Sequence, residues 1–428
     1  MGRVASAQAI GTTIEWYDFF IYGTAAALVF NKVFFPEMTP LIGVMLAMVT
    51  YGVGFLARPV GAVLFGHFGD RVGRKIALIV TLLMMGLATT AIGLIPSYAS
   101  IGVWAPLLLG FLRLVQGVAA GGEWGGAALI GIEHVDARRK TLFGSFAQVG
   151  SPLALLLATG VFLGLQQLPP EAFETWGWRV PFLFSAVLLP VGFFIRRRIH
   201  ESPDFEAVSR DKQVSRVPVV ELLAKHWRAV LIGTGSFAGV FATYYVFTSF
   251  VLAYATSTLG LSASVALPGN LIAAATEAVF IFIGVAAAVR YSARKVAVVG
   301  AVGLVVWAFP GFMLVHTKEA GLLYLAIIVS MAFVGITYGV LAAEVVQLFV
   351  ARVRYTGASL SYHLAAVIGG GIMPSLSTWL ADKTSSVWPV AAATAVIAVA
   401  MVLSCLLLPK QTPEGESAEL VEVGEGRA

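Results

Sequence analysis

Long apolar runs recur along this 428-residue chain and constrain its fold more than any other feature. A helix that crosses a bilayer core of ~30 Å needs about 20 apolar residues. Twelve segments have that length, at 10–33, 41–68, 76–96, 102–132, 141–165, 178–197, 227–256, 266–289, 296–315, 321–349, 357–381 and 387–408. Charged residues make up 12% of the chain, against about 25% in soluble domains, which disfavours a soluble globule. We therefore predict an all-α membrane protein with twelve transmembrane helices.

Basic residues are distributed unevenly between the loops. If the N-terminus is inside, 22 of the 28 lysine and arginine residues lie on the inner side and only four on the outer side. Inner loops of membrane proteins are enriched in positive charge, so this distribution places both termini in the cytoplasm. The first apolar run continues through two acidic residues without a cleavage site, and we expect it to be retained rather than removed as a signal peptide.

The chain divides into two similar halves. Segment 66–75 recurs in degraded form at 286–295, and segment 138–145 is echoed at 352–359. Parallel repeats at such an offset predict two six-helix bundles around an axis normal to the membrane. The expected divisions are an N-terminal bundle at 1–198, a cytoplasmic linker at 199–226, a C-terminal bundle at 227–408 and an acidic cytoplasmic tail at 409–428.

Segment 66–75, which reads Gly-His-Phe-Gly-Asp-Arg-Val-Gly-Arg-Lys, closely resembles the loop signature of the major facilitator superfamily between its second and third helices. More of the chain resembles one branch, the metabolite:proton symporters that include shikimate, 2-oxoglutarate, citrate and proline/betaine carriers. The matching stretches are 11–20, 57–61, 113–117, 121–126, 178–182, 201–203 and 354–359. This resemblance implies the major facilitator fold, alternating access, a monomer, and a place in the inner membrane of a bacterium.

The chain departs from that branch at three places. Arg290 replaces the acid of the second signature loop, and Gln347 stands where relatives usually have Glu, so gating in the C-terminal half is expected to differ. Osmosensing proline/betaine carriers also have a long C-terminal coiled coil. The tail at 409–428 is short and has no heptads, which counts against osmosensing.

Two acidic residues in the first span are candidates for proton coupling. Charged side chains inside a membrane should face protein or water, and they are functional candidates by default. Helical spacing places Glu15, Asp18 and Tyr22 on one face. Two carboxylates one turn apart repel each other, which favours binding of a proton by one of them. The alternatives are a structural ion pair with Arg58 or stabilisation of the start of the same helix.

Arg58 precedes Pro59 in the second span and is the third proton-coupling candidate. It could pair with Glu15 or Asp18 and be released when they become protonated, or it could form a fixed ion pair. A proline kink favours a mobile element, but a fixed pair would satisfy the same charges. The sequence leaves both roles open.

The fourth span carries polar residues that could line a cavity. Arg113 is the best cation for a substrate carboxylate, because guanidinium binds carboxylate through two parallel hydrogen bonds. The alternative is that Arg113 is an interhelical partner for Glu123. The full set of substrate-binding candidates is Tyr22, Arg113, Gln116, Glu123, Trp124 and Gln148. The glycines of this span, at 117, 121, 122, 125 and 126, are spaced for close helix packing.

The signature loop predicts a gate. Its candidate residues are Gly66, Asp70, Arg71, Gly73 and Arg74. Asp70 would pair with a basic group or a helix N-terminus of the other half when the cavity faces outward, and the two flanking glycines would permit a tight turn. The alternative is a basic loop that only sets the topology.

These features together predict a secondary active transporter that moves a small carboxylated metabolite with protons. Its partners would be the solute, protons and the lipid bilayer, with the proton gradient as energy source and no cofactor or metal. Symport of a zwitterion such as proline or betaine, an uncoupled facilitator or exchanger, and a non-transporting receptor remain alternatives. No phosphate-binding loop or metal-ligand spacing supports an enzyme. The basic residues lie in short loops, so a nucleic-acid partner is not expected.

Overall fold

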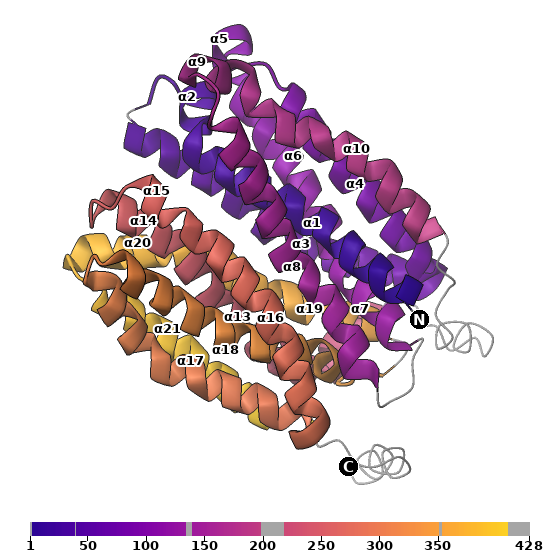
Figure 1. The fold of residues 1–428 in the computed structure, drawn as a ribbon. Coiled ribbons are helices and arrows are strands. Elements are labelled where there is room, and N and C mark those ends of the chain that lie inside the picture. Colours follow the sequence, from indigo (N-terminus) through magenta and orange to yellow (C-terminus); the bar gives the residue numbers. More distant parts are fainter. Residues whose placement is uncertain (1, 39, 134–138, 198–217, 351–352, 410–428) are drawn as a thin grey trace, which may run out of the picture.

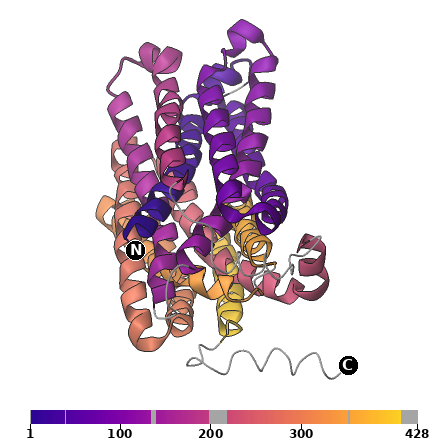
Figure 2. The same cartoon turned by 90° about the vertical axis from the view of Figure 1, so that its right-hand side faces the viewer.

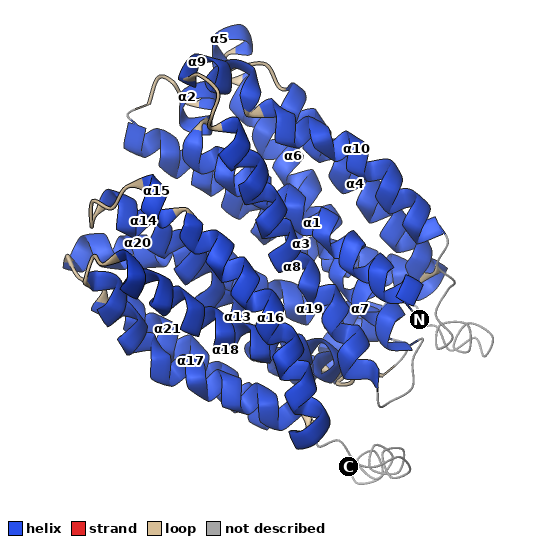
Figure 3. Cartoon of the chain, viewed as in Figure 1, coloured by secondary structure: helices blue, strands red, loops and turns tan. Residues whose placement is uncertain are grey.

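The computed structural model describes residues 2–38, 40–133, 139–197, 218–350 and 353–409. Within these ranges the chain consists of helices joined by short loops and contains no strand (Figure 3). The predicted linker at 199–226 and the tail at 409–428 fall largely outside the described residues. The described part of the linker is the short helix α12 (Pro218–Lys225).

Eleven spans among the described residues are long and apolar enough to cross a membrane. They are α3 (Pro40–Val72), α4 (Arg74–Leu94), α6 with α7 (Trp104–Gly121 and Glu123–Glu133), α8 (Lys140–Leu165), α9 with η2 and α10 (Pro170–Ala172, Phe173–Gly177 and Arg179–Arg197), α13 with η3 and α14 (Trp227–Tyr245, Val246–Phe250 and Val251–Ser257), α16 (Pro268–Tyr291), α17 (Ala293–His316), α18 (Ala320–Val346), α19 with η5 and α20 (Arg354–Ala366, Val367–Ile372 and Met373–Thr384) and α21 (Trp388–Leu406).

The twelfth helix is α1 (Gly2–Leu28), whose 27 residues span about 40 Å at 1.5 Å per residue. It is less apolar than the others because its middle carries Glu15 and Asp18, and both side chains are buried against neighbouring helices. The prediction of twelve transmembrane helices is therefore confirmed. Short helices α2 (Phe30–Phe34), α5 (Tyr98–Ile101), α9 (Pro170–Ala172) and α15 (Ala263–Ala266) lie at one end of the bundles (Figure 1).

The helices form two bundles, one from α1 to α10 and one from α13 to α21 (Figure 1). Figure 2 shows the N-terminal bundle, in indigo and magenta, above the C-terminal bundle, in orange and yellow. The ribbons converge where α7 and α19 meet and diverge toward the end that carries α2 and α15 (Figure 1). We call the converging side the closed end.

The two halves repeat the same turn. Gly73 joins α3 to α4 with φ 119° and ψ 143°, and Ser292 joins α16 to α17 with φ 75° and ψ 144°. The sequence repeat at 66–75 and 286–295 therefore corresponds to a structural repeat. A positive φ is easily adopted by glycine but costs free energy at Ser292, where a side chain is present.

The fourth span, predicted as a single segment at 102–132, consists of two consecutive helices, α6 and α7. The α-helix is interrupted by a turn at Gly122, between α6 and α7, where the Gly122 N–H donates to the Ala119 carbonyl oxygen at 3.1 Å. The predicted role of its glycines in packing is confirmed, because a Cβ at Gly117 would lie 2.2 Å from the Gly54 carbonyl oxygen of α3. A Cβ at Gly121 would lie 2.1 Å from the Arg58 carbonyl oxygen. Only glycine allows α3 and α6 to approach this closely.

Candidate functional site

Asp18 lies in the core of the N-terminal bundle with 1% of its surface exposed. Its Oδ2 atom accepts a 2.6 Å hydrogen bond from the Thr89 hydroxyl of α4, and its Oδ1 atom accepts a 2.7 Å bond from the Ser185 hydroxyl of α10. Arg58 does not take part in these bonds. The carboxyl group of Asp18 is therefore held by two neutral hydroxyl groups and not by the arginine expected from the sequence.

A chain of hydrogen bonds connects Asp18 to Arg113. The Nη1 atom of Arg113 donates to Oε1 of Gln116 at 2.9 Å, and Nε2 of Gln116 donates to Oγ1 of Thr89 at 2.7 Å. Thr89 in turn contacts Asp18. Three helices, α1, α4 and α6, thus bring together a carboxylate, a hydroxyl, an amide and a guanidinium that are all buried. The sequence predicted three of these four residues and missed Thr89.

Arg58 and Arg113 stack on the same phenyl ring. The Cζ atom of Arg58 lies 3.7 Å from the ring centroid of Phe19, and that of Arg113 lies 4.1 Å from it. Arg58 also lies 4.7 Å from the centroid of Phe55, and Arg113 lies 4.1 Å from that of Tyr22. Aromatic faces attract cations, so these rings partly compensate for the burial of two positive charges.

Most guanidinium nitrogens of these two arginines make no hydrogen bond. Among the described residues, Nε, Nη1 and Nη2 of Arg58 and Nε and Nη2 of Arg113 have no hydrogen-bond partner. Both side chains are 0% exposed. Gly54 makes room for Arg113, since a Cβ there would lie 2.8 Å from its Nε atom. Five buried donor nitrogens without acceptors are costly in free energy unless a ligand supplies the acceptors.

Other substrate-binding candidates bond to each other in this conformation. The indole Nε1 of Trp124 donates to Oε1 of Gln148 at 2.8 Å. The Trp124 ring stacks on Tyr362 of the C-terminal bundle, with centroids 3.9 Å apart, and the Tyr362 hydroxyl lies 2.6 Å from that of Tyr338. The Tyr22 hydroxyl donates to Thr50 at 2.7 Å. The contact between Trp124 of α7 and Tyr362 of α19 connects the two bundles.

The remaining predicted acids, Glu15 and Glu123, are also buried in the core, with 1% and 0% of their surface exposed. In the C-terminal bundle, Glu277 is 1% exposed and its Oε2 atom has no hydrogen-bond partner among the described residues. No group of three His, Cys, Asp or Glu side chains within the described ranges lies close enough to hold a metal ion.

The gate prediction is partly outside what the structure describes, because the side chains of Asp70 and Arg74 are not described. Arg71 is exposed, and its Nη1 atom lies 3.3 Å from Nε2 of His67 on the same helix. Gly73 forms the expected turn. Gly66 does not, since it lies inside α3, and the expectation of a turn there is wrong.

Gly66 instead contributes to packing between the bundles at the closed end. A Cβ at Gly66 would lie 2.8 Å from the Cα atom of Thr356 in α19, and one at Gly125 would lie 1.9 Å from Oγ of Ser359. Beside them, the Tyr355 hydroxyl donates a hydrogen bond to the Gly122 carbonyl oxygen. One face of α19 therefore packs directly against glycines of the N-terminal bundle.

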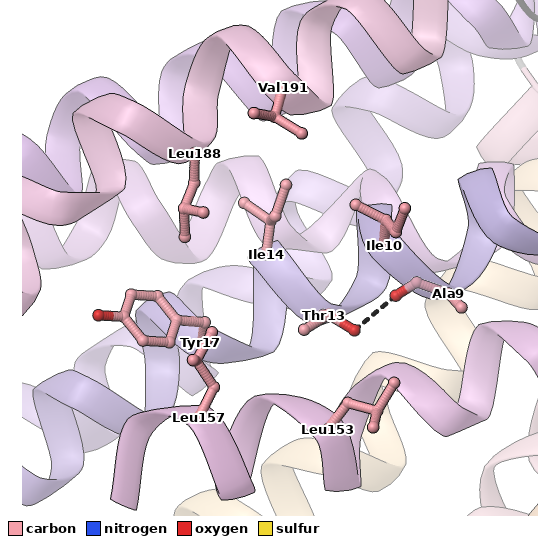
Figure 4. A pocket seen from close by; sticks show the side chains of 9 residues that line it. All are labelled: Ala9, Ile10, Thr13, Ile14, Tyr17, Leu153, Leu157, Leu188 and Val191. Atoms are coloured by element: carbon pink, nitrogen blue, oxygen red, sulfur yellow. Dashed lines mark hydrogen bonds between the residues drawn. The ribbon is translucent and has the colours of Figure 1, made fainter. Parts of the chain in front are cut away.

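A separate cavity of about 240 Å³ lies between α1, α8 and α10 (Figure 4). Its lining residues are Ala9, Ile10, Thr13, Ile14, Tyr17, Leu153, Leu157, Leu188 and Val191. The Thr13 hydroxyl donates to the Ala9 carbonyl oxygen at 2.6 Å, and the Tyr17 hydroxyl donates to that of Pro181 at 3.2 Å. Because no charged side chain lines this cavity, it does not suit a polar solute.

The sequence did not single out three residues that contact Asp18 or the buried arginines, namely Phe19, Thr89 and Ser185. Phe19 could have been found, because it lies about 40° from Glu15 on the same face of α1 at 100° per residue. Thr89 and Ser185 gave no signal, since hydroxyl residues are common in membrane helices and usually bond to their own backbone.

Comparison with known proteins agrees with this architecture. The sequence profile of the Major Facilitator Superfamily matches residues 9–363. The chain is 40% identical over 384 residues to the inner membrane metabolite transport protein YhjE of Escherichia coli (strain K12), which covers 88% of this chain and 87% of that protein. It is 38% identical over 412 residues to the shikimate transporter of the same strain, with 95% and 92% covered.

More distant relatives and solved structures extend the comparison. The proline/betaine transporter of E. coli (strain K12) is 31% identical over 410 residues, covering 93% of this chain and 81% of that protein. The structure of the proton:xylose symporter XylE aligns with a TM-score of 0.69 at 16% identity, with 94% of both chains covered. FucP in the outward conformation aligns with a TM-score of 0.65 at 12% identity, with 94% and 99% covered. The chain therefore belongs to the major facilitator superfamily, as a multi-span secondary transporter and not an enzyme.

Proposed function

We propose that this protein is a proton-coupled symporter of a small carboxylated metabolite. It would reside in the inner membrane of a bacterium as a monomer, with both termini in the cytoplasm and the proton gradient as its energy source. No cofactor, metal or nucleic acid enters the proposal. The observation that carries it is the pair of fully buried arginines, Arg58 and Arg113, with five guanidinium nitrogens that lack hydrogen-bond partners among the described residues.

A carboxylate suits these arginines by charge and by geometry. Guanidinium presents parallel N–H donors that match the two oxygens of a carboxylate, and such charge-assisted bonds are about twice as strong as neutral ones. Nε and Nη2 of Arg113 are adjacent donors, and both lack partners among the described residues. The similarity to a shikimate transporter supports a carboxylated solute. A zwitterion also carries a carboxylate, and the similarity to a proline/betaine transporter keeps it as the second candidate.

The site adjoins both bundles, as alternating access requires. Phe55, which contacts Arg58, meets the Tyr245 ring of α13 at 5.5 Å between centroids. The ring centroid of Phe20 in α1 lies 6.4 Å from that of Tyr244 in α13. A solute held by the arginines would therefore touch the C-terminal bundle, and its binding would alter the contacts between the two halves.

Asp18 is the proposed proton acceptor. It is buried and, within the described ranges, hydrogen-bonded only to hydroxyl groups, so a proton can bind without first breaking an ion pair. Protonation removes a negative charge near Arg113, which leaves that cation more available to a substrate anion. Binding of the proton and of the solute would then favour each other.

The test is a proton-entry assay on purified protein in liposomes that contain a pH-sensitive dye. Shikimate, 2-oxoglutarate, citrate, proline and betaine are added one at a time. Acidification with a carboxylated solute supports the proposal, provided that it is lost in Asp18→Asn and in Arg113→Gln. Arg228→Gln serves as a control, because it removes an exposed arginine at the start of α13 that is not among the candidate residues. Uptake of a solute without acidification would contradict proton symport and favour a facilitator.

A further inference from the structure

The hydrogen bonds from Arg113 to Asp18 all point in one direction. The guanidinium donates to Gln116, the Gln116 amide donates to Thr89, and the Thr89 hydroxyl donates to Asp18, over distances of 2.9, 2.7 and 2.6 Å. Each donor faces the negative end of the chain, so the bonds polarise one another and strengthen together. The arrangement fits an ionised Asp18, because a carboxylate only accepts hydrogen bonds.

Thr89 has a second acceptor within reach. Its Oγ1 atom lies 2.9 Å from the Met85 carbonyl oxygen, one turn earlier in α4. A hydroxyl has a single proton, so at any moment Thr89 donates either to Asp18 or to Met85. When Asp18 binds a proton, its new O–H becomes a donor, and Thr89 can accept from it only by turning its own proton toward Met85.

We propose that Thr89 is the relay through which the protonation of Asp18 controls the availability of Arg113 for substrate. With Asp18 ionised, the polarised chain holds Nη1 of Arg113 on Gln116. With Asp18 protonated, the Thr89 hydroxyl turns to Met85 and accepts from both Asp18 and Gln116. The series of hydrogen bonds then ends in a neutral group and its bonds weaken. Gln116 no longer holds Nη1, so the guanidinium can turn Nε and Nη2, which have no partner among the described residues, toward an anion. Thr89 is a positioning residue that acts through Gln116 and need not touch the solute.

This inference rests on the proposed function, because it explains how proton and solute binding are coupled. The coupling is reciprocal, so whatever protonation does for solute affinity, solute binding does for protonation. Coupling free energies between sites correspond to affinity changes of roughly 5- to 150-fold. A relay that carries most of the coupling should therefore have a large effect on the pH dependence of solute affinity.

The charged groups around Asp18 limit what else could produce such a pH dependence. Its own helix carries Glu15 and Tyr17, and α7 contributes Glu123. The neighbouring helices α3 and α6 contribute Arg58 and Arg113, while α4 and α10 meet Asp18 with hydroxyl groups. In its described residues, α8 has no charged side chain except Lys140 at its start. Glu15 and Glu123 are therefore the other carboxyl groups to test.

The deciding experiment compares Thr89→Val, Thr89→Ser and Thr90→Val in liposomes. Valine has the shape of threonine without the hydroxyl, and serine keeps the hydroxyl. Thr90 is a matched control, since its hydroxyl donates to the Gly86 carbonyl oxygen of its own helix at 2.8 Å and to no other group in the described part of the chain. The probe is the solute of the five above with the largest wild-type uptake, and the readout is its KM at several external pH values.

We expect the wild type, Thr89→Ser and Thr90→Val to show a KM that falls as the pH falls. In Thr89→Val the KM should change by less than about threefold over the same range, against the roughly 5- to 150-fold span of typical coupling. Gln116→Leu should show the same weak pH dependence of KM as Thr89→Val. The double variant should lose no more of this pH dependence than either single variant, because all three variants interrupt the same series of hydrogen bonds.

A wild-type pH profile in Thr89→Val would overturn the relay while leaving proton symport intact. If Thr90→Val loses the pH dependence of KM to the same extent as Thr89→Val, the relay is also overturned, because the effect would then come from altered packing of α4. A wild type that transports no solute of the panel, or whose KM does not depend on pH, would overturn the proposed function and the relay together. Thermal unfolding of each variant shows that the compared proteins are equally folded.

Discussion

The Phe19 ring contacts two buried positive charges, and its replacement offers a quantitative test of how they are tolerated. Both guanidinium carbons lie within 4.1 Å of its ring centroid. The two guanidinium carbons are therefore no more than about 8 Å apart, and unit charges at that separation repel by about 2 kcal/mol or more at an effective dielectric constant of 20. A desolvated cation–π contact contributes up to about 2 kcal/mol, so two of them can offset that repulsion. Phe19→Leu removes both contacts and keeps an apolar side chain.

Phe55→Leu is the matched control. Both rings are fully buried, and each has three aromatic neighbours. Phe55, however, contacts one guanidinium and Phe19 contacts two. The difference between the variants therefore isolates one cation–π contact, about 1–2 kcal/mol.

The assay is thermal unfolding of the purified protein in detergent. For a domain of roughly 200 residues, about the size of one bundle, each kcal/mol lost from the free energy of unfolding lowers the melting temperature by about 2–4 °C. Phe19→Leu should therefore melt about 2–8 °C below Phe55→Leu, which itself melts below the wild type. If Phe55→Leu melts as low as Phe19→Leu or lower, the rings act only as apolar filling, and the argument for charge compensation by Phe19 is refuted.

Three further predictions concern the backbone and the surface. Gly66→Ala should open the closed end and raise maleimide labelling of a cysteine introduced in α19, whereas Gly52→Ala on the same helix should not, because a Cβ there meets nothing within 4 Å. Ser292→Gly should raise the melting temperature by relieving a positive φ that costs about 1 kcal/mol or more, and a lower melting temperature would disprove that strain. Lys32→Gln should change stability by less than about 1 kcal/mol, because its ion pair with Glu174 is exposed, and unfolding curves would reveal a larger effect.

The sequence predicted the fold because its strongest signals are physical requirements of the bilayer. The twelve spans follow from length and apolarity alone, and the two halves follow from repeated loops. It also singled out Asp18, Gln116 and Arg113, which the structure joins through Thr89. Ionisable and amide groups stand out in an apolar helix, so each was visible without any knowledge of its neighbours.

What the sequence could not predict is which partners each residue chooses. An ion pair of Arg58 with Glu15 or Asp18 was one interpretation of the sequence. In the structure Asp18 bonds to Thr89 and Ser185, and Arg58 lies over the Phe19 ring of α1. Helix rotation and the choice between two nearby acceptors depend on tertiary packing. For the same reason Gly66 looked like a turn residue, although it lies inside α3 and faces α19.

The glycines that pack against α19 at the closed end, Gly66 and Gly125, also determine how sharply that end can open. Dispersion contacts lose a quarter to a half of their attraction when a gap of about 0.5–1 Å appears. Glycine offers no side chain that could follow α19 as it withdraws, so the attraction is lost at once along the whole surface. Water can then solvate the exposed carbonyl groups and offset the lost contacts. The closed end should therefore behave as an all-or-none latch with two discrete states and little population between them.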